Sequence, residues 1–126
     1  MDNYERLINI IKQQAEAFLL DAHEFFPFGT YVNSKNEVVP FSAYIEDAND
    51  RPESQPLIDV LERGIRTRIN SGDCIAGALA YDVEMTKNHV KFDVMVIRIY
   101  ENDKFVELYF KYDIYEGHVT FLEVEA

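Results

Sequence analysis

The fold is decided by residues 75–124, which read IAGALAYDVEMTKNHVKFDVMVIRIYENDKFVELYFKYDIYEGHVTFLEV. Three turn signals divide this stretch into strand-length pieces: residues 86–89, Asn102-Asp103 and Glu116-Gly117. A sheet with one wet face alternates apolar and polar residues, but here both faces are largely apolar. We therefore predict three or four consecutive antiparallel strands that are covered on both faces, by helices or by a second subunit.

The residues before this stretch predict a helix and a hairpin. Apolar residues at three- and four-residue steps predict a helix over residues 3–23, which ends before Pro27. Strands are expected at residues 28–32 and 37–44. Pro40 cannot donate a ladder hydrogen bond, so it marks the second strand as an edge strand or a bulge.

A loop and a second helix are expected between the hairpin and the long sheet. Residues 46–53 are acidic, contain a proline and lack any period, which is typical of a loop. A helix is predicted over residues 55–70, because Ser54 suits its N-cap and an apolar stripe follows. Gly64 lies inside this helix, where it would permit close packing against a strand.

These elements together predict a single α+β domain over residues 1–126. Their order is α-β-β-α-β-β-β, with a further strand if the last turn signal holds, and the mainly antiparallel sheet is packed by two helices. This order is similar to the profilin-like and roadblock-like arrangements, in which a five-stranded antiparallel sheet sits between helices. The likeness is one of topology and implies no function.

The turn signals also predict a register. If Met85 and Val90 close the first hairpin, an alanine strip (Ala76, Ala78 and Ala80) faces Ile99, Ile97 and Met95 on the neighbouring strand. A two-residue turn at Asn102-Asp103 then places Ile99, Ile97 and Met95 opposite Val106, Leu108 and Phe110. The same turn places Arg98 opposite Glu107, as a cross-strand ion pair. Small side chains beside large ones let a helix approach this face closely.

The predicted register creates one candidate site for a cation. It places Asp82 directly opposite Asp93, with Glu84 two residues along on the same face and opposite Lys91. Like charges across a sheet are destabilising, so the pair indicates either a hard-cation site or a proton-sharing dyad with one raised pKa. The alternative is a solvated pair at the end of the sheet, compensated by Lys91 or a helix N-terminus.

A second candidate site is an aromatic cluster around the first hairpin. The side chains that would line a ligand pocket there are Phe26, Phe28, Tyr31, Phe41 and Tyr44, with Phe25 beside them. The alternative is that these rings form the seam between the first helix and the hairpin. Gly29 inside this segment indicates a bulge or a close approach of two chain segments.

Charge and composition exclude several classes of function. The formal net charge is −11 at pH 7, from 23 acidic and 12 basic residues, without a lysine or arginine cluster. Nucleic acid and anionic membrane surfaces are therefore not expected partners, whereas a basic protein suits electrostatic steering. The lone Cys74 excludes an internal disulfide, and we expect it to be a small buried residue in a cytoplasmic protein.

No residue pattern of a known catalytic or cofactor site is present. His23, His89 and His118 lack ligand spacing, and there is no nucleophile elbow or glycine-rich phosphate loop. We therefore expect no cofactor, and the residues favour a protein that is not an enzyme over an enzyme.

Residues 24–32, EFFPFGTYV, resemble the opening of a family of small bacterial proteins of unassigned function. The resemblance continues through Val38-Val39-Pro40, Pro52-Glu53-Ser54 and the Ala-x-Ala-Tyr-Asp-Val segment of residues 78–83. Some members are encoded in settings that indicate toxin immunity. The resemblance thus implies one domain over most of the chain and an immunity role, and it carries over no catalytic residue.

Three hypotheses of function follow. The first is an acidic interaction module that binds another protein, such as a basic toxin that it neutralises. The second is a domain that binds a small molecule or a divalent cation, centred on Asp82, Asp93 and Glu84 or on the aromatic cluster. The third is a homodimeric scaffold whose sheet face is covered by its twin.

Overall fold

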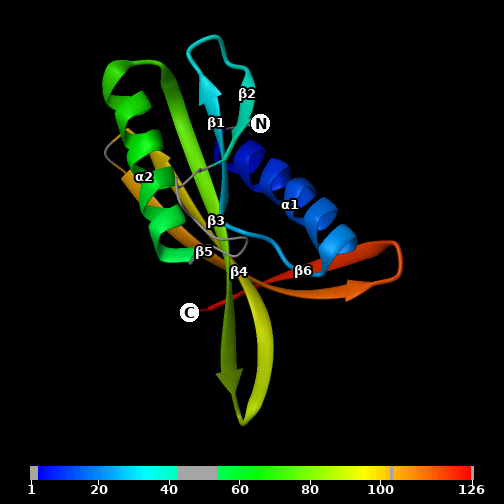
Figure 1. Cartoon of the computed structure of the whole chain (residues 1–126). Coiled ribbons are helices and arrows are strands. Elements are labelled where there is room, and N and C mark those ends of the chain that lie inside the picture. The colour runs from blue at the N-terminus through cyan, green and yellow to red at the C-terminus, as the bar shows by residue number, and fades with distance from the viewer. Residues whose placement is uncertain (1–2, 43–53, 103, 126) are drawn as a thin grey trace.

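The computed structural model describes residues 3–42, 54–102 and 104–125 (Figure 1). Tyr44 and the predicted loop at residues 46–53 lie outside the described residues. Each of the predicted helices and strands in the described ranges is present, and the fold is α+β as expected. The elements are α1 (Asn3–Ala22), β1 (Phe28–Asn33), β2 (Val38–Phe41), α2 (Ser54–Ser71), β3 (Cys74–Lys87), β4 (Val90–Glu101), β5 (Lys104–Tyr115) and β6 (His118–Val124).

The described strands form one antiparallel, curled sheet in the order β2-β1-β3-β4-β5-β6 (Figure 1). β2 is an edge strand, as Pro40 predicts, and Pro40 lies opposite Thr30 of β1. The other edge is β6, which closes a two-residue turn with β5 at Glu116-Gly117. α2 is therefore followed by four consecutive antiparallel strands, where the sequence predicted three or four.

The two helices cover opposite faces of the sheet (Figure 1). α1 packs on the alanine strip, where Ala76, Ala78 and Ala80 are fully buried beneath Leu7, Ile11 and other side chains of the helix. The small side chains leave room for the helix backbone to lie close to the strand. This bears out the face predicted for helix packing.

α2 packs on the reverse face, against Leu79 of β3 and Tyr100 of β4. Gly77 makes this contact possible, because a Cβ atom there would meet the Ile65 side chain at 2.8 Å. A second close approach occurs at Gly29, where a Cβ atom would lie 2.6 Å from the Phe41 ring. Both glycines therefore allow two chain segments to approach closely, because they have no side chain. The sequence predicted a bulge or such a close approach at Gly29.

The predicted register of the β4–β5 hairpin is confirmed, and that of the β3–β4 hairpin is wrong by two residues. Ile97 faces Leu108 and Arg98 faces Glu107, as expected. In the β3–β4 hairpin, however, Lys87 pairs with Val90, so that Ala78 faces Ile99 and Ala80 faces Ile97. The reason is the turn: Asn88 and His89 both adopt positive φ angles, which makes a two-residue turn that matches the strand twist.

The sheet divides into two arms beyond Val94 and Lys111, the last residues at that end that pair β4 with β5. β3 and β4 continue as a pair to Lys87 and Val90, and we call residues 84–93 the β3–β4 arm. β5 and β6 continue to Tyr115 and His118, and we call residues 112–121 the β5–β6 arm. In Figure 1 the β3–β4 arm projects below both helices, whereas the β5–β6 arm curls beneath α1.

Candidate functional site

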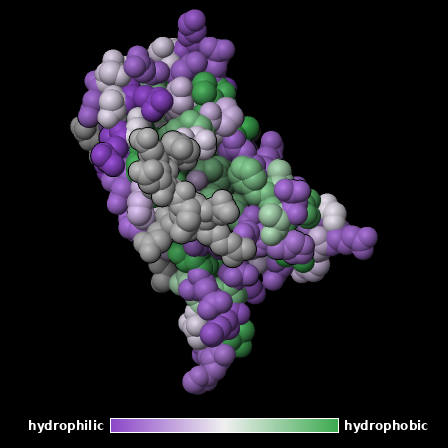
Figure 2. All heavy atoms as spheres, in the orientation of Figure 1, coloured by the Kyte–Doolittle hydropathy of each residue, from purple (hydrophilic) through white to green (hydrophobic). Residues whose placement is uncertain are grey.

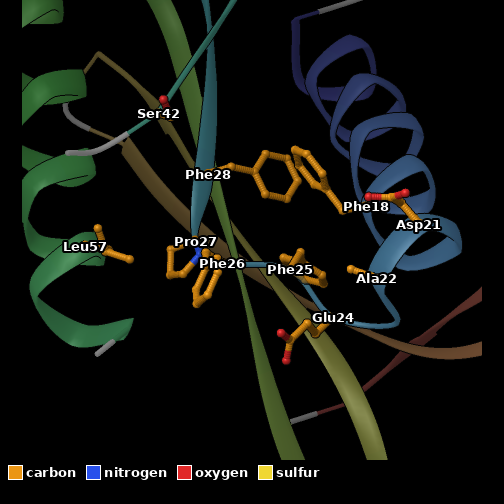
Figure 3. Close-up of a pocket in the computed structure, with 10 residues that line it drawn as sticks. All are labelled: Phe18, Asp21, Ala22, Glu24, Phe25, Phe26, Pro27, Phe28, Ser42 and Leu57. Atoms are coloured by element: carbon orange, nitrogen blue, oxygen red, sulfur yellow. The ribbon is translucent and has the colours of Figure 1, made fainter. Parts of the chain in front are cut away.

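An apolar pocket of about 390 Å³ lies between the C-terminal end of α1, the segment that leads into β1, and the start of α2 (Figure 3). We call it the phenylalanine pocket. Figure 2 shows apolar side chains gathering at the middle of this side of the molecule. The pocket is lined by Phe18, Asp21, Ala22, Glu24, Phe25, Phe26, Pro27, Phe28, Ser42 and Leu57.

The local sequence explains why aromatic rings gather here. α1 ends at Ala22, and His23 takes a positive φ of 61° with its N–H donated to the carbonyl of Leu19, which closes the helix. Pro27 then favours an extended backbone before β1. Phe25 and Phe26 lie in this short connection, Phe28 begins β1, and Phe26 remains 45% exposed at the pocket.

The rings of the pocket pack edge to face. Phe28 meets Phe18 with centroids 5.2 Å apart and Phe25 at 5.5 Å, both in T-shaped geometry. Phe28 and Phe25 are buried, whereas Phe18 and Phe26 expose almost half of their surface. Two buried rings beneath two exposed rings form an apolar binding site that could accept a side chain or a small ligand.

The mouth of the pocket is anionic. Asp21 lies in the last turn of α1 and Glu24 lies just beyond it, and both carboxylates line the pocket. The last turn of α1 carries no basic residue, although the C-terminal end of a helix has a partial negative charge that favours cations. Among the described residues, no ion pair neutralises Asp21 or Glu24. A cation at the mouth would relieve this concentration of negative charge.

Asp82 lies near this mouth, at the root of the two arms. It accepts a hydrogen bond of 2.8 Å from the hydroxyl of Tyr112, whose ring lies 6.3 Å from that of Phe25. Burial raises the pKa of Asp82 to about 6. The hydrogen bond from Tyr112 opposes this rise, and the charges of Asp93 and Glu24 add to it. Asp82 therefore changes its charge close to neutral pH.

The predicted cation site has a different arrangement in the structure. Asp82 faces Met95, and Asp93 faces Glu84, because the register differs by two residues from the prediction. Glu84 and Asp93 are exposed, and Lys91 lies 3.9 Å from Glu84 instead of directly opposite it. In the described part of the chain, no group of three or more His, Cys, Asp or Glu side chains is placed to hold a metal ion.

The structure divides the predicted aromatic cluster between two faces of the sheet. Phe26 and Phe28 line the phenylalanine pocket, with Phe25 beside them. Tyr31 and Phe41 pair with each other on the α2 face, 5.5 Å apart, where Arg68 lies over both rings. Tyr44 lies outside the described residues.

Sequence reasoning placed Phe25, Phe26 and Phe28 in the aromatic cluster and did not find the other seven lining residues. Leu57 belongs to α2 and is distant in sequence from the aromatic cluster, whereas Phe18 and Asp21 lie at the end of α1, just before the cluster. One signal was available for Phe18 and Asp21, because both lie on the last two turns of a helix that leads directly into the cluster.

A second polar cluster lies on the α2 face around Arg98. Its guanidinium is 2.8 Å from Glu107 and 3.8 Å from Glu62. Tyr109 donates a hydrogen bond to Glu107, and Tyr100 donates one to Glu62. The Tyr109 hydroxyl, followed by Arg98, lowers the pKa of Glu107. Both carboxylates of this cluster are paired with Arg98 and with a tyrosine hydroxyl. We therefore interpret the cluster as structural.

Cys74 is buried, as predicted, with its thiol directed to the carbonyl of Ala76. Burial raises the pKa of the Cys74 thiol, which disfavours the reactive thiolate.

Comparison with protein-family models, with curated proteins and with solved structures finds no match for this chain. In the ranges that the structure describes, neither helix has the length and apolar character needed to cross a membrane.

Proposed function

We propose that this chain is a protein-interaction module that binds a basic partner through the phenylalanine pocket. One observation carries the proposal: an apolar pocket with exposed rings has at its mouth two carboxylates that no ion pair within residues 3–42, 54–102 and 104–125 neutralises. An apolar side chain of the partner would enter between Phe18 and Phe26. A neighbouring lysine or arginine would lie beside Asp21 and Glu24.

The net charge of −11 supports the same class of partner, because a strongly acidic surface speeds the encounter with a basic protein. The resemblance to proteins encoded in toxin-immunity settings makes a basic toxin the partner that we propose. We place the interaction in the cytoplasm, because the lone, buried Cys74 suits a reducing compartment.

Binding is tested with a peptide in which one tryptophan is flanked by lysines. The chain contains no tryptophan, so the fluorescence of the peptide reports entry into an apolar site without background. We expect a blue shift with the wild type and binding weakened about tenfold or more by Phe26→Asp. Phe105→Asp is the matched control, because Phe105 is 47% exposed and does not line the pocket.

The charge requirement is tested by removing both carboxylates from the mouth. Asp21→Asn with Glu24→Gln should weaken binding of the lysine peptide about fivefold at low salt and less at high salt. Asp113→Asn with Glu116→Gln removes the same charge from the exposed end of the β5–β6 arm and should leave binding unchanged. Equal losses in the two double variants would mean that net charge alone attracts the peptide.

A small apolar molecule is the second candidate for the pocket, because 390 Å³ is within the range of small-ligand sites. Indole serves as the probe. If indole binds as tightly as the lysine peptide, and the double variant at the mouth binds it equally well, the pocket belongs to a small neutral ligand.

The natural partner is identified by native mass spectrometry of the chain purified from its own cytoplasm. We expect a basic protein that co-purifies with the wild type and with Phe105→Asp, and that Phe26→Asp loses. A co-purifying protein that is retained by Phe26→Asp would exclude the pocket as its binding site.

A further inference from the structure

A second surface with different chemistry lies on the α2 face of the sheet, where the two arms separate. A groove of about 580 Å³ runs between them, lined by Met85, Thr86, Lys87, Phe92, Lys111, Val124 and Glu125. We call it the lysine groove. The helix on this face, α2, packs mainly on β3 and less on β1 and β4, and it starts level with the middle of the sheet (Figure 1).

The charges of the lysine groove are unlike those of the rest of the molecule. The chain carries −11, yet the groove has two lysines and one glutamate. Lys111 lies over the Phe92 ring at 5.7 Å, and no ion pair in the described residues neutralises Lys87 or Lys111. This is therefore a place where an acidic molecule can approach without net repulsion.

Apolar side chains continue from the groove to the open edge of the sheet. Leu122 of β6 lies opposite Lys111 in the register and is 65% exposed. The outer side of β6 has no strand partner in the described sheet, and β6 contains neither proline nor lysine, which commonly protect an edge. The β3–β4 arm beside it is a two-stranded projection, an element that is marginally stable by itself.

We propose that a second copy of this chain docks on the lysine groove and forms a two-fold symmetric dimer. In such a contact both copies use the same surface. If one residue of the first copy touches a second residue of the other copy, the reverse contact is also made. Unlike charges can meet across the contact, because each groove holds two lysines and one glutamate around apolar side chains. Lys87 and Lys111 of one copy face Glu125 of the other, while Phe92, Leu122 and Val124 of both copies form the apolar centre.

The test is the oligomeric state of the full chain, measured by sedimentation velocity over a concentration series. We expect a monomer–dimer equilibrium that Leu122→Asp weakens about tenfold or more. Val90→Asp is the matched control: Val90 is 63% exposed, lies at the tip of the β3–β4 arm and does not line the groove. A monomer at every concentration, or an open series of larger assemblies, would overturn the proposal.

Charge reversal tests the pairing itself. Lys87→Glu with Lys111→Glu should weaken the dimer about tenfold or more, and adding Glu125→Lys should recover part of the loss. Lys35→Glu with Lys104→Glu changes the net charge equally at exposed sites outside the groove and should leave the dimer intact. Equal weakening by both double variants, or no recovery with Glu125→Lys, would exclude the proposed contacts.

Two further measurements separate this proposal from its alternatives. A synthetic acidic peptide with one central phenylalanine is titrated as the competing occupant. If the chain stays monomeric and binds this peptide, and the groove lysines are required, the groove belongs to an acidic partner instead of a second copy. Phe26→Asp should leave the dimer unchanged, so the dimer and the pocket proposal can fail independently.

Discussion

The two arms of the sheet have similar sequences and different surroundings. Each is a two-stranded hairpin that ends in a two-residue turn and carries a valine close after that turn. Val119 of the β5–β6 arm is 7% exposed, because it joins the core beneath α1, whereas Val90 of the β3–β4 arm is 63% exposed. Val119 faces α1, whereas strand alternation places Val90 on the opposite face, which α2 does not reach at the tip of the arm. The comparison teaches that an apolar residue of this sheet is buried only where its face of the strand lies beneath a helix.

The first prediction compares the two valines directly and has the largest expected effect. Val119→Asp places a charge in the core beneath α1 and should lower the free energy of unfolding by about 4 kcal/mol or more. Val90→Asp should change it by less than about 0.5 kcal/mol, because Val90 is solvated. Urea denaturation followed by circular dichroism measures both. Equal losses would mean that the β3–β4 arm is also packed in solution.

The second prediction concerns Asp82, at the root of the arms, and depends on pH. The pKa of Asp82 in the folded chain, about 6, lies above the usual value of 3.8. Protonated Asp82 thus favours the folded state, and this contribution is fully present below pH 3.8 and lost as the pH rises through 6.

Asp82→Asn should therefore remove a decline in the free energy of unfolding, on the order of 1–3 kcal/mol, between pH 4 and pH 7. Asp113→Asn, an exposed substitution on the β5–β6 arm, should retain the decline. Glu107 has a lowered pKa and the opposite sign: its contribution is lost as the pH falls below its usual value of 4.5. An unchanged pH profile in Asp82→Asn would show that burial does not raise this pKa.

The third prediction, with the smallest effect, concerns the contact that holds the β5–β6 arm to α1. A carboxylate oxygen of Glu16 accepts the N–H of Val119 at 3.0 Å. Glu16→Ala should lower the free energy of unfolding by about 1 kcal/mol and speed hydrogen exchange at the Val119 amide. The Lys91 amide on the β3–β4 arm should exchange at an unchanged rate. Equal changes at both amides would indicate a global loss of stability.

The sequence predicts most of the fold because its signals are local. Apolar periodicity identified both helices, and Asn102-Asp103 set the β4–β5 register. The β3–β4 register was wrong because the turn has His89 where two-residue turns commonly have glycine, so four residues were assigned to the turn.

The candidate site was less predictable, because it depends on contacts between distant elements. Phe28 and Tyr31 are three residues apart on one strand, so alternation already predicts opposite faces for them. The sequence did contain that signal. The lining by Leu57 of α2 and the separation of the arms depend on the tertiary arrangement and had no local signal.

The contact between Glu16 and Val119 also has a consequence for the order in which the molecule can form. The two residues are 103 positions apart, and α1 rests on β1, β3, β4 and β6. Loops of such length close slowly, whereas the consecutive hairpins from β3 to β6 pair through neighbouring residues. During synthesis on the ribosome α1 emerges before β6, so the apolar side of α1 lacks its complete binding surface until Val119 has been added.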